Sequence, residues 1–183
     1  MSRNTGNTLY FVYGWQLDAR LLERYCPSAR IVASARLPGY ELGFFGYSQK
    51  WDGAEEAIFD SRDGAVWGLV LDLNRADAQR LDDAQSVHGD GSGAYFHYPA
   101  EVEGSDGQRH EVLFYMKSSR GEPRPPSAEY RDRIADGALA HGLPADYIER
   151  LRGIAAPPAG YPVPHGLKEL PMVAVDLNSP CHF

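Results

Sequence analysis

Long apolar runs are absent from this 183-residue chain. No run approaches the roughly 20 residues that a bilayer-spanning helix needs, so no membrane partner is expected. Cysteine is scarce as well, with only Cys26 and Cys181. The two could pair, but nothing in the sequence indicates an oxidising compartment, so both are expected to be free thiols. The first seven residues are polar and lack the apolar core of an export signal, which favours a cytoplasmic location.

Basic residues are in the minority. The chain has 18 Lys and Arg against 25 Asp and Glu, giving a formal net charge of −7 and a pI near 5.3. Nucleic acids and anionic membranes select basic surfaces, so neither is expected as a partner. The sequence shows no repeats, no low-complexity segment and no feature that indicates an oligomer. Its length and its 43% hydrophobic content are typical of one globular domain,.

Strand patterns dominate the first two-thirds of the chain, and helical patterns dominate the last third. This order predicts an α+β fold. Asn74 is expected to cap one helix, and Gly142 to end another. Strands are predicted over 8–13, 30–45 (one long strand, or two broken near Pro38-Gly39), 57–59, 65–73, 94–102 and 111–117. Helices are predicted over 74–85, 127–141 and 144–153, and a short helix or turn over 18–25. The residues 1–154 form the expected domain, and the proline-rich residues 155–183 form a tail laid on its surface, with a possible last strand from Met172 to Leu177.

The stretch from Tyr10 to Leu17 indicates an apolar strand that runs into a glycine turn and then a helical segment. Such a turn presents backbone N–H groups that can bind an anion or a polarised carbonyl. A second stretch, Leu81 to Val87, is followed after a turn by Gly93-Ala94-Tyr95. Together the two stretches resemble the gamma-glutamylcyclotransferase family, whose members have Tyr-Gly-Ser-Asn-Leu early and a catalytic Glu before Gly-x-Tyr.

The resemblance covers roughly residues 8–154. It extends to Trp51-x-Gly53, Val66-Trp67-Gly68, Pro125-Pro126-Ser127 with Tyr130, and Gly142-Leu143-Pro144 with Tyr147. It implies a small mixed β-barrel flanked by helices, with the active site in a cavity at the barrel mouth.

The resemblance also implies a reaction. The free α-amine of a γ-glutamyl group attacks its own γ-carbonyl, which gives 5-oxoproline and releases an amine. One Glu moves the protons, and neither a metal nor an organic cofactor is needed. The histidines add no metal-ligand spacing either,. A small-molecule substrate would lie against Tyr13, Gly14, Trp15, Gln16 and Leu17, with Tyr95 and Tyr130 lining the cavity.

Gln85 stands where the family has its catalytic Glu. An amide cannot carry protons near neutral pH, so the loss of an acid–base group at this position costs about 10²–10⁴-fold in rate. Trp15 and Gln16 replace the family's Ser and Asn. We expect Trp15 at the cavity mouth and outside the core, so that Trp15→Ser would change ligand preference more than stability.

Another carboxylate could take over the acid–base role. Glu55 and Glu56 lie in an otherwise apolar stretch, and strand geometry sends them to opposite sides,. Glu56 shares a face with Ala54, whose small side chain leaves room, so Glu56 is the favoured inward residue. Burial would raise its pKa toward that of a useful base. A pair formed by His88 and Asp90 over the cavity mouth is a further candidate, although such a segment is typical of a solvated turn.

Two functional hypotheses follow. The first is a gamma-glutamylcyclotransferase-like enzyme with a rebuilt acid–base site, in which Gln85 orients the substrate and Glu56 or Glu55 transfers the protons. Its substrate would be a γ-glutamyl amide or a related small acyl-amine compound, in a specialised pathway for example. The second is a catalytically inactive relative that binds a small metabolite or a protein in the same cavity.

Overall fold

The computed structural model describes residues 7–166, in which five strands close into a barrel. The strand order is β1 (Thr8–Val12), β3 (Gly53–Leu73), β2 (Arg30–Ser48), β4 (Tyr95–Gly104) and β5 (Arg109–Lys117). Neighbouring strands run antiparallel except β1 and β5, which pair in parallel at Tyr10 with Leu113 and close the barrel. The predicted α+β fold, a mixed barrel flanked by helices in one domain, is confirmed.

Strands β2 and β3 form one long hairpin whose tip is the turn 49–52. The predicted separation of β3 at Asp60–Gly64 is wrong, because the strand continues through this segment. Pro38 pairs with Ala65 and Tyr40 pairs with Asp60, so the intervening residues of β3 bulge out opposite Gly39. Gly39 has a φ of 82°, which a residue without Cβ adopts easily, and the hairpin bends there without ending,.

Two helices begin at side chains that cap them, and Asn74 is the one predicted from the sequence. Asp18 accepts hydrogen bonds from the amides of Arg20 and Leu21 and caps α1 (Ala19–Tyr25). Asn74 accepts from the Asp77 amide and caps α2 (Arg75–Ala84),. The remaining helical elements are the short 3₁₀ helix η1 (Trp15–Leu17), α3 (Ala128–Ala140) and α4 (Ala145–Arg152).

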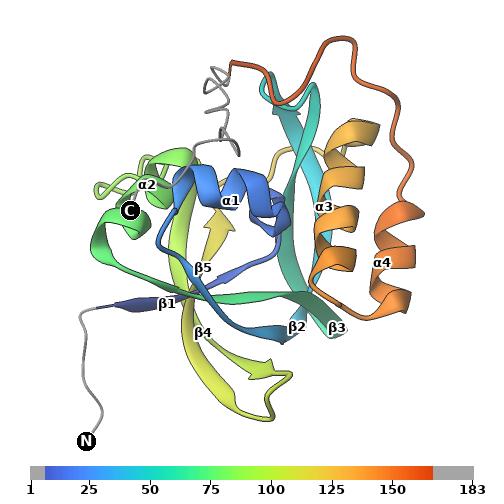
Figure 1. Cartoon of the computed structure of the whole chain (residues 1–183). Coiled ribbons are helices and arrows are strands. Elements are labelled where there is room, and N and C mark those ends of the chain that lie inside the picture. The colour runs from blue at the N-terminus through green and yellow to red at the C-terminus, as the bar shows by residue number, and fades with distance from the viewer. Residues whose placement is uncertain (1–6, 167–183) are drawn as a thin grey trace, which may run out of the picture.

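Helices α3 and α4 pack against each other on one side of the barrel, and α1 and α2 lie together on another (Figure 1). Gly137 lets α3 approach η1 closely, because a Cβ there would stand 2.5 Å from the Leu17 carbonyl oxygen. Two hydrophobic clusters result. One is built from strand residues and Tyr13 and fills the barrel, and the other joins the barrel to the helices.

The segment 154–166 runs from α4 back to the tip of the hairpin (Figure 1). The expected strand at Met172–Leu177, and Cys181, lie outside the described residues. Cys26 is buried and forms no disulfide within residues 7–166, and burial raises its pKa to about 12. No helix within residues 7–166 combines the length and the apolarity that crossing a membrane requires.

Candidate active site

Glu56 is a buried carboxylate near the start of β3, opposite Phe44 of β2. It is 2% exposed and lies on the same face of β3 as Ala54 and Ile58. Ala54 belongs to the cluster between barrel and helices, whereas Ile58 belongs to the cluster inside the barrel. Glu56 therefore sits at the end of the barrel, where the two clusters meet.

Two tyrosines fix the position of Glu56. The Tyr130 hydroxyl, from α3, donates a hydrogen bond to Glu56 Oε2. The Tyr95 hydroxyl, from the start of β4, donates to the Glu56 backbone carbonyl at 2.9 Å. Burial raises the pKa of Glu56 to about 7, and the hydrogen bond from Tyr130 opposes that shift. The carboxyl group can therefore take up and release a proton near neutral pH.

Glu55 points to the other side of β3 and is half-buried. Its Oε2 lies 3.5 Å from Lys117 Nζ, and the Lys117 side chain is only 11% exposed. Lys117 also lies over the Tyr95 ring, 5.6 Å from its centroid. Besides the effect of burial, the Glu55 charge raises the pKa of Glu56, and the Lys117 charge lowers it. The charges of Glu55 and Lys117 thus shift the pKa of the buried Glu56 carboxyl group in opposite directions.

Gly14 lets the Glu56 carboxylate approach the backbone before η1. A Cβ on Gly14 would collide with Glu56 Oε1 and would stand 3.1 Å from Gln16 Oε1. Gln16 is 2% exposed, and its Oε1 has no hydrogen-bond partner within residues 7–166. A buried acceptor without a donor is costly. Two side-chain oxygens therefore lie beside Gly14 at a place that suits the N–H groups of a ligand.

Gln85 caps the C-terminal end of α2 and is 7% exposed. Its Oε1 accepts a hydrogen bond from Trp15 Nε1 at 3.1 Å. The Gln85 amide thus holds the indole of the η1 segment in place. Its NH₂ group has no acceptor among the residues that the structure describes, so it can donate toward a ligand.

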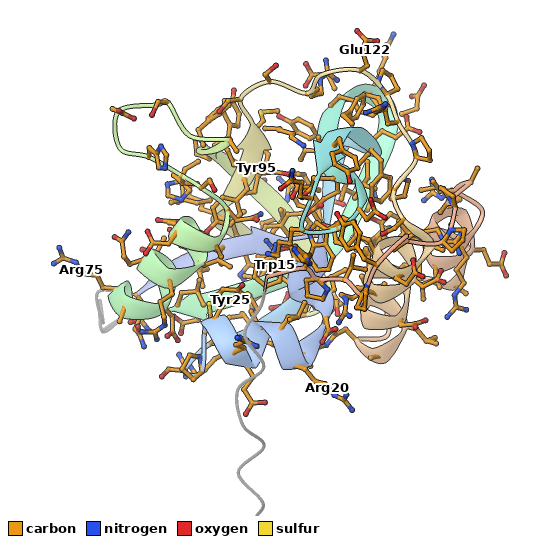
Figure 2. The ribbon with its side chains drawn as sticks, turned by 90° about the horizontal axis from the view of Figure 1, so that it is seen from above. Trp15, Arg20, Tyr25, Arg75, Tyr95 and Glu122 are labelled. Atoms are coloured by element: carbon orange, nitrogen blue, oxygen red, sulfur yellow. The ribbon has the colours of Figure 1, made fainter. Side chains whose placement is uncertain are left out.

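Trp15 does not lie where it was expected. The side chain is 2% exposed and belongs to the core between barrel and helices, so the expected position at the cavity mouth, outside the core, is wrong. Its ring lies 5.0 Å from that of Tyr25. Trp15 occupies the middle of the view in Figure 2, with the labelled charged residues at the edge of the molecule. Trp15 begins the short helix η1, and its large indole fills the adjoining core.

The other expected binding residues are also enclosed. Tyr13 donates its hydroxyl hydrogen bond to the Tyr115 carbonyl, and Leu17 is fully buried against α3. Apart from Glu55, all the residues expected to bind the substrate or transfer its protons are buried. A substrate must therefore displace side chains to reach Glu56.

The side chains of His88 and Asp90 make no hydrogen bond or ion pair with Glu56 or Gln85 among residues 7–166. They lie in an exposed turn, in which Asp90 accepts from the Ser92 amide at 3.0 Å and His88 lies 3.2 Å from the Ser92 hydroxyl. The Asp82 carboxylate is engaged in a structural contact, since its Oδ1 accepts a hydrogen bond from the Tyr115 hydroxyl at 2.8 Å.

Lys117 was not predicted as a site residue, although the alternation of side chains along β5 could have indicated it. Alternation along β5 puts it on the same face as Tyr115, which is buried, so a cation at that position points inward,. Taken together, the site offers one neutral-range acid–base group, two acceptors beside a glycine turn, and a tyrosine that can stabilise the carboxylate form. This set suits proton transfer from an amine to another amine.

Known proteins share this architecture. The profile of the AIG2-like family matches residues 65–151. Proteins named gamma-glutamylcyclotransferase from Mus musculus and Homo sapiens are both 33% identical over 150 residues, which span 80% of this chain and 78% of each relative. A solved structure titled gamma-glutamyl cyclotransferase superimposes with a TM-score of 0.78 at 32% identity, covering 86% of this chain and 93% of that one.

Proposed function

The chain belongs to the gamma-glutamylcyclotransferase family of enzymes, and we propose that it cyclises a small γ-glutamyl amide with Glu56 as the acid–base group. The products are 5-oxoproline and a free amine. The proposal transfers the family's reaction to this chain and moves the proton carrier from the end of α2 to strand β3.

The proton balance sets the task of Glu56. The substrate's α-ammonium gives a proton to the Glu56 carboxylate, and the freed amine attacks the γ-carbonyl carbon of the same molecule. A C–N bond forms in the five-membered ring, and the C–N bond to the leaving amine breaks. In total the attacking nitrogen loses two protons and the leaving nitrogen gains two, and Glu56 carries them in turn. Because the attack is intramolecular, positioning supplies much of the rate.

One observation carries this proposal: the buried Glu56 carboxyl group lies against Gly14, at the turn where the family binds the glutamyl group. Its raised pKa supports a role as a base near neutral pH,. The unpaired Gln16 Oε1 beside it supports the binding of an ammonium group there. Gln85, whose oxygen is engaged by Trp15, would orient the substrate through its NH₂ group.

The pH dependence of the rate tests the proposal. We expect kcat/KM for 5-oxoproline release from γ-glutamylalanine to rise with pH along an acidic limb with an apparent pKa near 7. The limb arises because Glu56 must lose its proton before it can accept one from the substrate. An ordinary glutamate would place the limb near pH 4.3, about the value of a solvated side chain. Chromatographic measurement of 5-oxoproline between about pH 5 and pH 9 gives the profile.

A rate that does not change between about pH 5.5 and pH 8 would contradict Glu56 as the base. Folded protein that releases no 5-oxoproline at any pH, yet binds γ-glutamyl compounds, would favour the inactive binding relative instead.

A further inference from the structure

Lys50, in the turn at the tip of the β2–β3 hairpin, points its ammonium group into a set of aromatic rings. Its Nζ lies 5.0 Å from the centroid of the Trp15 ring, 5.7 Å from that of Tyr25 and 5.2 Å from that of Trp51. Three ring faces attract a cation and keep it partly out of water. A primary ammonium is thereby held at a fixed place.

This ammonium lies beside the proposed active site. Trp15 is hydrogen-bonded to Gln85, and Trp51 stacks on Tyr130 with their centroids 4.1 Å apart. Tyr130 in turn binds the Glu56 carboxylate. Burial lowers the pKa of Lys50, and the charges of Glu55 and Glu56 oppose that shift through space.

No carboxylate among residues 7–166 pairs directly with Lys50. Within residues 7–166 its ammonium makes no ion pair and no hydrogen bond, only the contacts with the rings. Lys117, the other lysine near Glu56, already pairs with Glu55. Lys50 therefore keeps three N–H donors and a positive charge for which the described part of the chain supplies no acceptor.

The backbone that carries Lys50 is fixed from behind by the segment 154–166. The Tyr161 hydroxyl donates to the Gln49 carbonyl at 2.6 Å, and the His165 amide donates to the Lys50 carbonyl at 2.7 Å. The Gly160 amide donates to Asp52 Oδ2 at 2.6 Å. These bonds hold the turn in place without a ligand, so binding at Lys50 costs little conformational entropy in the turn itself.

We propose that Lys50 binds a carboxylate of the substrate and makes the enzyme selective for acidic γ-glutamyl compounds. The inference rests on the proposed function for the identity of the acyl group. A γ-glutamyl amino acid has two carboxylates, one on the glutamyl α-carbon and one on the leaving amino acid, and either can supply the acceptor. The ammonium of the same molecule would lie at Glu56 and Gln16, so the ammonium and one carboxylate of the substrate would each meet a side chain of opposite charge, Glu56 and Lys50.

Three matched compounds separate the two carboxylates. γ-Glutamylalanine carries both, γ-glutamylethylamine lacks that of the leaving group, and 4-aminobutyrylalanine lacks that of the glutamyl group. Binding is measured by calorimetry on the full chain with Glu56→Gln, so that the ligands are not consumed, and on the same chain with Lys50→Met added. Met keeps the apolar stem against the rings and removes only the charge. Lys50→Gln replaces it if the Met variant does not fold.

We expect Lys50→Met to weaken the binding of γ-glutamylalanine about 10–100-fold, the effect of losing a charge-assisted hydrogen bond. The affinity for one of the two analogues should stay unchanged. The carboxylate that this analogue lacks is the one that Lys50 binds. Lys50→Arg should retain most of the affinity. Equal effects of Lys50→Met on all three compounds, or no effect on any, would overturn the inference, as would an absence of binding.

The proposed function can fail separately. If native protein binds γ-glutamylalanine through Lys50 but releases no 5-oxoproline, the carboxylate site stands and the reaction does not. If 5-oxoproline is released and the rate is indifferent to Lys50, the reaction stands and the carboxylate site does not.

Discussion

Glu56→Gln should lower the rate of 5-oxoproline release by about 10²–10⁴-fold, the usual contribution of a general acid–base group. The amide has the size of the carboxyl group and keeps an oxygen that can accept from the Tyr130 hydroxyl, but it cannot carry a proton,. Steady-state kinetics with γ-glutamylalanine, by chromatography of the product, measure the loss. The acidic limb near pH 7 should disappear with it.

Loss of fold would not explain such a result. The pKa of Glu56 is raised on folding from 4.5 to about 7, so between these values the folded protein binds a proton that the unfolded chain releases. The contribution of Glu56 to the free energy of unfolding therefore falls as the pH rises through that window. The amide of the Glu56→Gln variant does not titrate, and at pH 8 this variant should be at least as stable as the native protein in urea.

Two variants serve as matched controls. Glu55→Gln removes the neighbouring carboxylate, which is half-buried and paired with Lys117, and should cost less than about tenfold,. Adding Gln85→Glu to Glu56→Gln returns a carboxylate to the end of α2 and should restore part of the lost rate. If Glu56→Gln turns over as fast as the native protein, Glu56 is not the proton carrier.

Trp15→Ser should lower the free energy of unfolding by about 3–5 kcal/mol, the range for deletion of a large buried aromatic side chain. The indole is 2% exposed, packs near Tyr25, and donates its N–H to Gln85. Its removal leaves a cavity in the core between barrel and helices and an acceptor on Gln85 without its donor. Urea denaturation followed by circular dichroism measures the change.

Trp67→Ser provides the comparison, because Trp67 is the partly exposed tryptophan of β3. It should cost clearly less than Trp15→Ser. A loss at Trp15 below about 1 kcal/mol, together with altered ligand preference, would instead favour a position at the cavity mouth.

The sequence was sufficient for the parts of the fold that depend on local chemistry. Capping by Asn74 follows from a side chain that bonds the backbone of its own helix. The inward side of Glu56 follows from strand alternation beside a small neighbour. The continuity of β3 through Asp60–Gly64 could not be predicted, because Gly39 on the partner strand decides whether these turn residues end a strand or bulge from it.

The site itself depended on contacts between distant segments. The position of Trp15 could not be predicted because the core cluster that contains it also includes residues of α2, α3 and β5, far along the chain. Lys50 gave no signal, since a lysine in a polar turn is ordinarily solvated, and only the fold brings three rings around it. Pairing of Glu55 with Lys117 likewise joins β3 to the end of β5.

The close approach of Glu56 to Gly14 makes the two positions epistatic. Any side chain at position 14 would meet the Glu56 carboxylate, so with Glu56 in place an alanine there forces the carboxylate away from the turn. With a small residue at position 56 the same alanine loses that obstacle. A lineage could therefore acquire a carboxylate on β3 only while position 14 was glycine. Wherever Glu56 is present and approaches the turn in this way, glycine is therefore expected at position 14.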